Sequence, residues 1–181
     1  MKKESVIVSI ARTPIGSFQG TLSTVPAVRL GATAISGALE RAGINSEDVD
    51  EVIMGNVISA GIGQAPARQA ALYGGLSKKV ECMTINKVCG SGLKAVMLAD
   101  QAIRCGDAKV VIAGGMENMS QAPYYLMEVR KGMRMGHKKA VDSLLQDGLW
   151  DPYGDIHMGN CAEILAKEEN YTREEQDSFA I

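Results

Sequence analysis

The sequence predicts an α/β fold with a largely parallel sheet, and three observations favour it. Short apolar runs of strand length alternate with helical patterns between residues 5 and 115. Glycine follows most of the helical patterns, as is typical of helix ends. Hydrophobic residues make up 46% of the 181 residues but aromatic residues only 4%, so we expect a core of aliphatic and small side chains.

The first four elements are predicted in order along the chain. Residues 5–11 form a β-rich apolar run and are expected to be the first strand. A helix should begin near Pro26, which suits a first helical turn, and end at Gly43. Residues 49–59 predict a second strand, and residues 65–75 predict a short helix that is ended by glycines.

Three further elements follow before the pattern changes. Residues 80–86 predict a strand, and residues 91–105 predict a helix that stops at Gly106. This helix has little polar face, because nine of its fifteen residues are apolar or cysteine, so we expect it to be buried between layers. Residues 108–115 form a continuous apolar run, which is typical of a strand buried on both faces.

The chain changes character after Gly115. Residues 116–160 are rich in Met, Gly, Tyr and basic side chains, with a helical piece at 139–147, and we interpret them as an insertion over the core. We therefore divide the chain into a core, residues 1–118, and a second part, residues 119–181.

Two helices are expected at the end of the second part. One covers residues 162–169, and a capping box formed by Thr172 and Glu175 opens the other. That helix has run about ten residues when the sequence stops at Ile181 without a stop signal, so we expect the chain to be a fragment of a longer protein.

Composition excludes several classes of function. The net charge is −2 with both signs interspersed, which argues against partners such as nucleic acid or an anionic membrane. No segment approaches the roughly 18 consecutive apolar residues that span a bilayer. The apolar run at the N-terminus is interrupted by Ser9 and ends at Arg12, so it resembles a strand more than a signal peptide. The four cysteines form no CxxC pair, which favours a reducing, cytoplasmic setting.

Cys89 occupies the corner between a predicted strand and a predicted helix. Unpaired backbone N–H groups and the positive end of the helix dipole favour a thiolate there, and they could also hold a developing oxyanion. Gly90 and Gly92 should permit a tight turn and the close approach of a substrate carbonyl, and Ser91 can cap the helix. On local context alone, a nucleophile and an inert structural cysteine fit this position about equally well. We assign structural roles to Cys82, Cys105 and Cys161.

Several motifs of the sequence resemble those of one known family. "INKVCGSGLKAV" closely resembles the nucleophile motif of the thiolase family, in particular its acetyl-CoA acetyltransferases. "ARTPIGSF", "VVIAGGMENMSQAPY" and "DGLWDPYGDIHMGNCAEILAK" resemble other motifs of that family, and together the matches cover essentially all of the chain. The resemblance implies two similar halves packed in αβαβα layers, each with a mixed, mostly parallel sheet and a buried central helix. The family chain is about twice as long as this one, so residues 1–118 would be the N-terminal core half and residues 119–181 part of an inserted loop domain.

The resemblance also implies a reaction. Cys89 would attack an acyl-CoA thioester, and the carbanion of a second acetyl-CoA would attack the acyl-enzyme to give acetoacetyl-CoA; thiolysis is the reverse. No cofactor or metal is implied, because the coenzyme A thioesters are substrates. Thioester exchange suits a cysteine, since the nucleophile and the leaving group are both thiolates.

Further residues take roles from the same resemblance. Leu149, His157 and Met158 would lie along the pantetheine arm of coenzyme A, and Met135 would lie on a loop that reaches a neighbouring subunit in a tetramer. A homo-oligomer is therefore expected when the protein is complete. A basic cluster could attract the nucleotide end of coenzyme A, although a solvated charged loop explains it equally well. The cluster consists of Arg130, Lys131, Arg134, His137, Lys138 and Lys139.

The resemblance also shows what this chain lacks. In the family, a histidine that activates the nucleophile and a second cysteine that acts as acid and base both lie in the C-terminal half. We therefore expect this chain alone to be poorly active or inactive. An alternative is a non-catalytic fragment that binds full-length subunits through the strand leading to Cys89. An unrelated cysteine hydrolase fits less well, since no Cys/His/Asn constellation is present.

Overall fold

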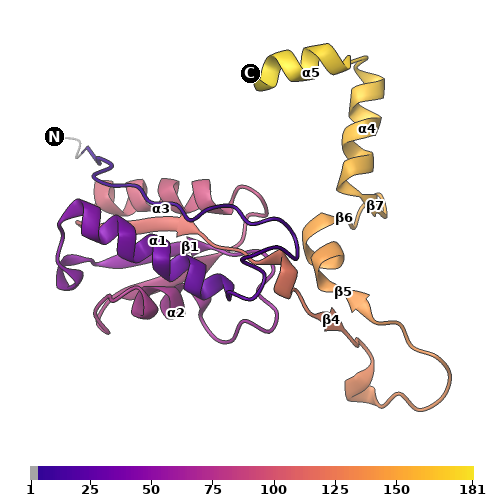
Figure 1. Cartoon of the computed structure of the whole chain (residues 1–181), viewed down its shortest axis with the longest axis horizontal. Coiled ribbons are helices and arrows are strands. Elements are labelled where there is room, and N and C mark those ends of the chain that lie inside the picture. Colours follow the sequence, from indigo (N-terminus) through magenta and orange to yellow (C-terminus); the bar gives the residue numbers. More distant parts are fainter. Residues whose placement is uncertain (1–3) are drawn as a thin grey trace. The chain divides into compact units, whose positions relative to one another are not determined.

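Three parallel strands form the centre of the N-terminal part of the chain. The structure is a computed structural model that describes residues 4–181, and it divides into two compact units, one ending at Pro123 and one covering Tyr124–Ile181 (Figure 1). In the first unit, β1 (Glu51–Gly55) is the central strand, with β2 (Glu81–Ile85) on one edge and β3 (Val111–Gly115) on the other. All three strands are parallel, as the sequence predicts.

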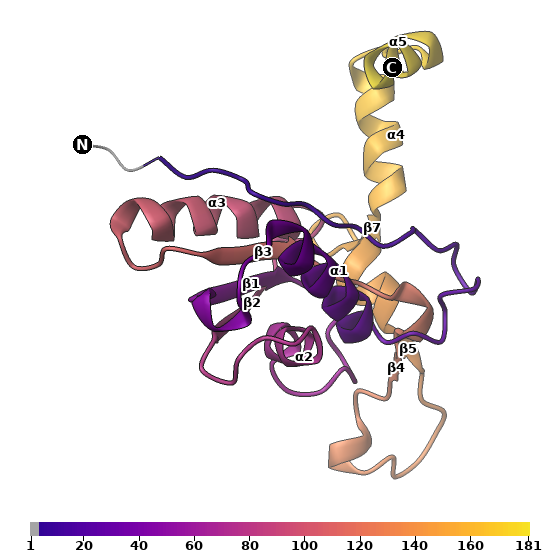
Figure 2. The same ribbon diagram turned by 60° about the vertical axis from the view of Figure 1, so that its left-hand side comes forward.

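Helices cover the two faces of this sheet. α3 (Ser91–Cys105) packs on β1 and β3, and α2 (Pro66–Tyr73) packs on β1 and β2 from the opposite side (Figures 1 and 2). α1 (Ala27–Ala42) packs against α2 and completes that layer. The resulting order of strand and helix is that of an α/β layered fold.

The core of the first unit centres on β1. Val52, Ile53 and Met54 are almost completely buried, as expected for the central strand of a parallel sheet. Val52 and Met54 join a cluster with residues of α1 and α2. Because side chains alternate along a strand, Ile53 points to the opposite face, where α3 lies.

The helix boundaries agree with the stop and start signals in the sequence. α1 follows Pro26 and ends at Gly43, which adopts a left-handed φ of 64°. α2 begins after Ala65, whose side chain cannot cap a helix. Thr84 of β2 supplies the cap instead, because its Oγ1 accepts the Ala67 N–H at 2.9 Å.

The predicted first strand is wrong for this chain. Residues 5–11 are extended but pair with none of the described strands, and Val6, Ile7 and Val8 are between 64% and 77% exposed. The segment runs beside α3 (Figure 2), where Ser5 bonds Asp100 and the Arg41 guanidinium donates to the Ile10 carbonyl at 2.8 Å. A hollow of about 550 Å³ separates it from the helices and β3, and an apolar run without a neighbouring strand cannot form a ladder.

α3 and β3 are also less buried than the sequence predicts. α3 is buried along one stripe, formed by Ser91, Ala95 and Ala99, whereas Leu93 is 70% exposed and Met97 is 50% exposed. β3 is only partly buried along its length. The sheet covers one face of α3, and within the described residues of the first unit no second layer covers the other.

The second unit consists of small β-ribbons and two helices. The helical piece predicted at 139–147 is correct only in its last part, because residues 141–142 form a strand and the π-helical turn is Leu145–Leu149. The other elements are β4 (Tyr124–Tyr125), β5 (Val141–Asp142), β6 (Trp150–Asp151), β7 (Ile156–His157), α4 (Met158–Glu168) and α5 (Arg173–Ala180). β4 pairs antiparallel with β5, and β6 pairs antiparallel with β7.

The capping box predicted for the last helix is confirmed. Thr172 Oγ1 accepts the Glu175 N–H at 3.2 Å, and the Glu175 carboxylate accepts the Thr172 N–H at 2.8 Å. The same bond lowers the pKa of Glu175. None of the helices in the described part of the chain has the length and apolar character needed to cross a membrane.

Candidate active site

The carboxyl ends of the three parallel strands bring polar residues to one edge of the sheet. Asn56 follows β1, Asn86 follows β2, and Glu117 follows β3 after one intervening residue. Cys89 lies four residues beyond the end of β2, is exposed, and comes two residues before the start of α3. The edge where ligands bind in open α/β sheets therefore carries the thiol.

Two side chains fix the turn that carries Cys89. Asn86 Oδ1 accepts the Val88 N–H at 2.9 Å. Ser91 Oγ accepts the Lys87 N–H at 2.8 Å and donates to the Val88 carbonyl at 2.6 Å. Within this turn Val88 adopts a φ of 47°, in the left-handed region that β-branched residues rarely occupy.

The predicted cap of α3 is not the one in the structure. Gly90 is the N-cap residue and no side chain caps the helix, because the Ser91 hydroxyl is engaged with the preceding turn. The Ser91 N–H donates to the Val88 carbonyl at 3.0 Å and the Lys94 N–H to the Gly90 carbonyl at 2.9 Å, so the N–H groups of Gly92 and Leu93 are the ones left open to a ligand. A thiolate or an oxyanion is the type of group that they would favour.

Close approach at this corner depends on Gly55 of β1. A Cβ at this position would lie 2.6 Å from the Ser91 Cβ and 2.8 Å from the Ser91 carbonyl carbon. Gly90 and Gly92, which the sequence analysis singled out, make no such approach and have no positive φ. Gly55 therefore allows the start of α3 to sit directly on the end of β1.

The other cysteines occupy different environments. Cys82 is half-buried on β2, and burial raises the pKa of its thiol against the opposing effect of Arg68. Cys105 is exposed at the opposite end of α3 from Cys89, and Cys161 is half-buried in α4. All four thiols are free. Only Cys89 lies at a helix N-terminus next to a sheet edge.

Leu149, His157 and Met158 come together around one ribbon of the second unit. Leu149 directly precedes β6, Met158 directly follows β7, and the ribbon pairs Trp150 with His157. His157 Nδ1 accepts the Gly159 N–H at 2.9 Å and so caps α4. In the neutral imidazole this leaves the proton on Nε2, which can donate to a ligand. Cys89 belongs to the first unit, and the predicted contacts with coenzyme A stay predictions.

The loop between β4 and β5 carries the basic cluster and Met135. Met135 is 93% exposed. The members of the cluster are all exposed: Arg130, Lys131, Arg134, His137, Lys138 and Lys139. Lys138 forms an ion pair with Glu128 of the same loop, so part of the positive charge is already neutralised.

Glu117 holds the loop after β1. Its carboxylate accepts the N–H groups of Val57, at 2.8 Å, and Ile58, and it accepts the side-chain amide of Asn56 at 2.9 Å. Burial raises the pKa of Glu117, and these hydrogen bonds oppose the rise. The Asn56 side chain also donates to the Met116 carbonyl.

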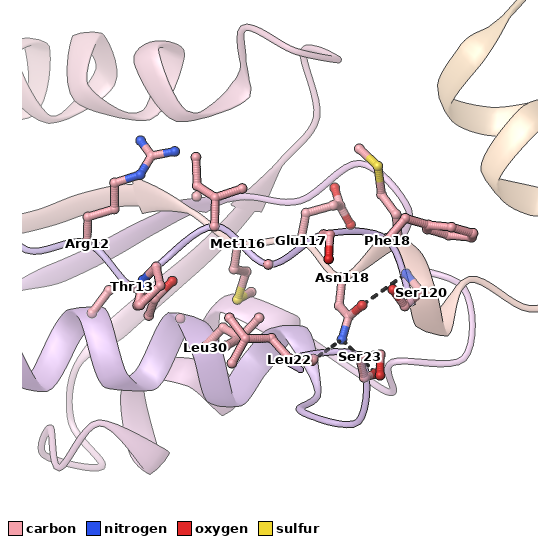
Figure 3. A pocket seen from close by; sticks show the side chains of 18 of the residues that line it. Arg12, Thr13, Phe18, Leu22, Ser23, Leu30, Met116, Glu117, Asn118 and Ser120 are labelled. Atoms are coloured by element: carbon pink, nitrogen blue, oxygen red, sulfur yellow. Dashed lines mark hydrogen bonds between the residues drawn. The ribbon is translucent and has the colours of Figure 1, made fainter. Parts of the chain in front are cut away.

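Asn118, which also follows β3, holds the segment that precedes α1. Its side-chain amide donates to the carbonyls of Leu22 and Ser23 (Figure 3). It also donates to the Val25 carbonyl at 2.7 Å. Glu117 and Asn118 line a hollow of about 590 Å³ whose lining does not include Cys89. These contacts give both residues a structural role, since each holds a neighbouring loop in place.

Two residues of this site were not identified from the sequence. Gly55 looks like an ordinary end of a strand, and its importance comes from α3, which follows 36 positions later. Asn86 had a local signal, because asparagine commonly bonds the backbone N–H two residues later in a turn.

Comparison with known proteins identifies the family. The family model described as the thiolase N-terminal domain matches residues 5–181. This chain belongs to the thiolase family. The α/β architecture with its parallel sheet is thus a thiolase N-terminal fold, as the resemblance implied.

Individual relatives agree with the thiolase assignment. The chain is 60% identical over 176 residues to an acetyl-CoA acetyltransferase of Cupriavidus necator, which covers 97% of this chain and 45% of that protein. It is 58% identical over 178 residues to an acetyl-CoA acetyltransferase of Pseudomonas aeruginosa, covering 98% and 45% respectively. It is 55% identical over 179 residues to acetyl-CoA acetyltransferase 2 of Arabidopsis thaliana, covering 99% and 44%. This thiolase chain therefore spans less than half the length of these relatives.

Proposed function

We propose that this chain is the N-terminal part of an acetyl-CoA acetyltransferase and that Cys89 is its nucleophile. The observation that carries the proposal is the position of Cys89, an exposed thiol at the uncapped N-terminus of α3, in a chain more than half identical to proteins of that name. The four free thiols are compatible with a reducing compartment such as the cytoplasm.

The proposed reaction has two halves. In the first, the Cys89 thiolate attacks the thioester carbon of acetyl-CoA, a sulfur–carbon bond forms, and coenzyme A leaves as a thiolate that takes up a proton. In the second, another acetyl-CoA loses an α-proton to a base, and its carbanion attacks the acyl-cysteine to release Cys89 and acetoacetyl-CoA. The open N–H groups of α3 are placed to stabilise negative charge on the carbonyl oxygen during the first half.

The second half of the reaction needs groups outside this sequence. We propose that the histidine and the second cysteine of the family lie in a C-terminal half, and that the complete protein is a homo-oligomer. The 45% coverage of the relatives supports a longer protein. The exposed stripe of α3 that includes Leu93 and Met97 supports a covering layer, because exposed apolar side chains on an ordered helix favour burial.

Leu149, His157 and Met158 are proposed to contact the pantetheine arm of coenzyme A. Leu149 is partly exposed and Met158 is half-exposed, so both offer apolar surface. The Nε2–H of His157 offers a hydrogen bond to an amide carbonyl. The basic loop between β4 and β5 would add attraction for the phosphates.

The test is acylation of the purified 181-residue chain by acetyl-CoA, followed by intact mass and peptide mapping. We expect one slow acetyl adduct on Cys89, and no acetoacetyl-CoA, because the proposed base for condensation is outside the chain. Cys89→Ala should abolish the adduct. Cys105→Ala is the matched control, since Cys105 is an equally exposed thiol at the other end of the same helix, and it should leave the adduct unchanged.

Three results would contradict parts of this proposal. An adduct that survives Cys89→Ala would place the acyl group elsewhere. A folded chain that forms no adduct would show that the helix terminus alone does not activate the thiol. Condensation by the isolated chain at the rate of a complete enzyme would instead refute the proposed need for a C-terminal half.

A second candidate is a non-catalytic role, in which the chain binds full-length subunits. It is favoured by the free edge of β2, which pairs with β1 on one side only among the described strands. Co-purification with an intact acetyl-CoA acetyltransferase would support it. Loss of that co-purification when the exposed Met83 of β2 is replaced by lysine would locate the contact.

A further inference from the structure

The turn that presents Cys89 contains a conformation that its sequence does not favour. Val88 has a φ of 47° and is half-exposed, so no close packing forces its side chain into place. For a β-branched residue the left-handed region is disfavoured by roughly tenfold or more relative to the extended region. Something in the fold must therefore hold Val88 where it is.

Three side-chain hydrogen bonds contribute to that restraint, and all of them involve Asn86 or Ser91. The Ser91 backbone N–H adds a fourth bond, to the Val88 carbonyl at 3.0 Å. Asn86 accepts the Val88 N–H, whereas Ser91 accepts the Lys87 N–H and donates to the Val88 carbonyl. Both polar groups of the Val88 backbone are thus engaged by a side chain. A hydrogen bond of this kind contributes about a fivefold preference, so three together exceed the penalty at Val88.

Ser91 is also the better anchored of the two residues. Ser91 is 5% exposed and packs against Gly55 of β1. A Cβ built on Gly55 would lie 2.6 Å from the Ser91 Cβ. Its hydroxyl therefore has a fixed position relative to the sheet. Asn86 is exposed and extends directly from the end of β2.

We propose that Ser91 and Asn86 are positioning residues that hold Val88 in the left-handed conformation and so keep the Cys89 thiol at the N-terminus of α3. This inference rests on the proposed function, because it concerns how Cys89, the proposed nucleophile, is held in position. When either restraint is lost, Val88 relaxes to a negative φ and Cys89 turns away from the helix end.

The test measures how fast iodoacetamide alkylates each cysteine of the full 181-residue chain, resolved by peptide mass spectrometry. At pH 7 we expect Ser91→Ala to slow alkylation of Cys89 about fivefold, while Cys105 in the same molecules reacts at its original rate. At a pH where every thiol is ionised the difference should largely disappear. Partial unfolding would instead speed alkylation at every pH.

Restoring the alkylation rate with a second substitution distinguishes a positioning role of Ser91 from a general structural one. Glycine adopts a positive φ without penalty, so Val88→Gly should restore most of the rate in the Ser91→Ala chain, whereas Val88→Ala should not. Ser77→Ala is the matched control, because the Ser77 hydroxyl also accepts a backbone N–H, that of Lys79, in the loop that enters β2. This substitution should change the alkylation rate of neither Cys89 nor Cys105.

Each outcome decides the proposal. Slowing at Cys89 that Val88→Gly rescues supports it, and either no slowing or slowing without rescue overturns it. If Ser91→Ala does not fold, the exposed Asn86→Ala takes its place with the same rescue. Alkylation needs no acetyl-CoA, so a failure of this series is distinct from a failure of Cys89 to accept an acetyl group.

Discussion

Replacing Gly55 by alanine tests how tightly α3 sits on the sheet. Carbon atoms that are not bonded normally approach to about 3.5–4.0 Å. The new Cβ would lie 2.6 Å from the Ser91 Cβ and 3.0 Å from the Gly92 nitrogen, so the start of α3 must move by about 1 Å. Overpacking of this kind costs about 1–3 kcal/mol, and the upper end applies because backbone atoms are involved.

The expected effect is a lower melting temperature, measured by circular dichroism or calorimetry. In a chain of this size about 3 kcal/mol corresponds to a decrease of roughly 6–12 °C. Gly37→Ala in α1 is the matched control, since its Cβ would meet only Ala11 at an ordinary 3.6 Å. Alanine is the better helix former by about 1 kcal/mol, so this control should raise the melting temperature by roughly 2–4 °C. Equal melting temperatures for the two variants would refute the steric reasoning.

Two further predictions concern single hydrogen-bonding side chains. The pKa of Asp50 is lowered by the N–H groups of Val110 and Lys109, so its stabilisation is present above the ordinary pKa of 3.8 and is lost as pH falls through the lower folded value. The melting temperature of Asp50→Asn should therefore lie furthest below that of the parent near pH 6 and converge with it below about pH 3.8, and a constant gap would contradict this. Thr84→Val removes the cap of α2 and should lower the free energy of unfolding in urea by about 1 kcal/mol, whereas the exposed Thr33→Val should change it much less.

The sequence was informative wherever an element is specified locally. α1 and α3 follow their terminal signals, and α3 has the predicted bounds of residues 91 and 105. The position of Cys89 at the start of α3 could likewise be predicted, because strand, turn and helix are adjacent in the sequence. The family resemblance added the architecture, which the match over residues 5–181 supports.

The sequence was less informative wherever a partner from elsewhere in the chain decides the outcome. Residues 5–11 have strand propensity, but a strand forms only beside another strand, and none of those described pairs with them. The steric role of Gly55 depends on a helix that begins 36 residues later. Ser91 was expected to cap α3, yet its hydroxyl bonds the turn before it, and nothing in the residue type chooses between these two uses.

The unpaired segment at the N-terminus also has a consequence for handling the protein. Residues 5–11 contain four β-branched apolar side chains with no proline and no charge, which is the composition of aggregation-prone stretches. Single side-chain bonds, from Asp100 at one end and from Arg41 at the other, hold this segment against the first unit. When either bond opens, the freed strand can add to the open edge of β3 in a second molecule. We therefore expect self-association of the isolated chain to begin at this segment and to increase with protein concentration.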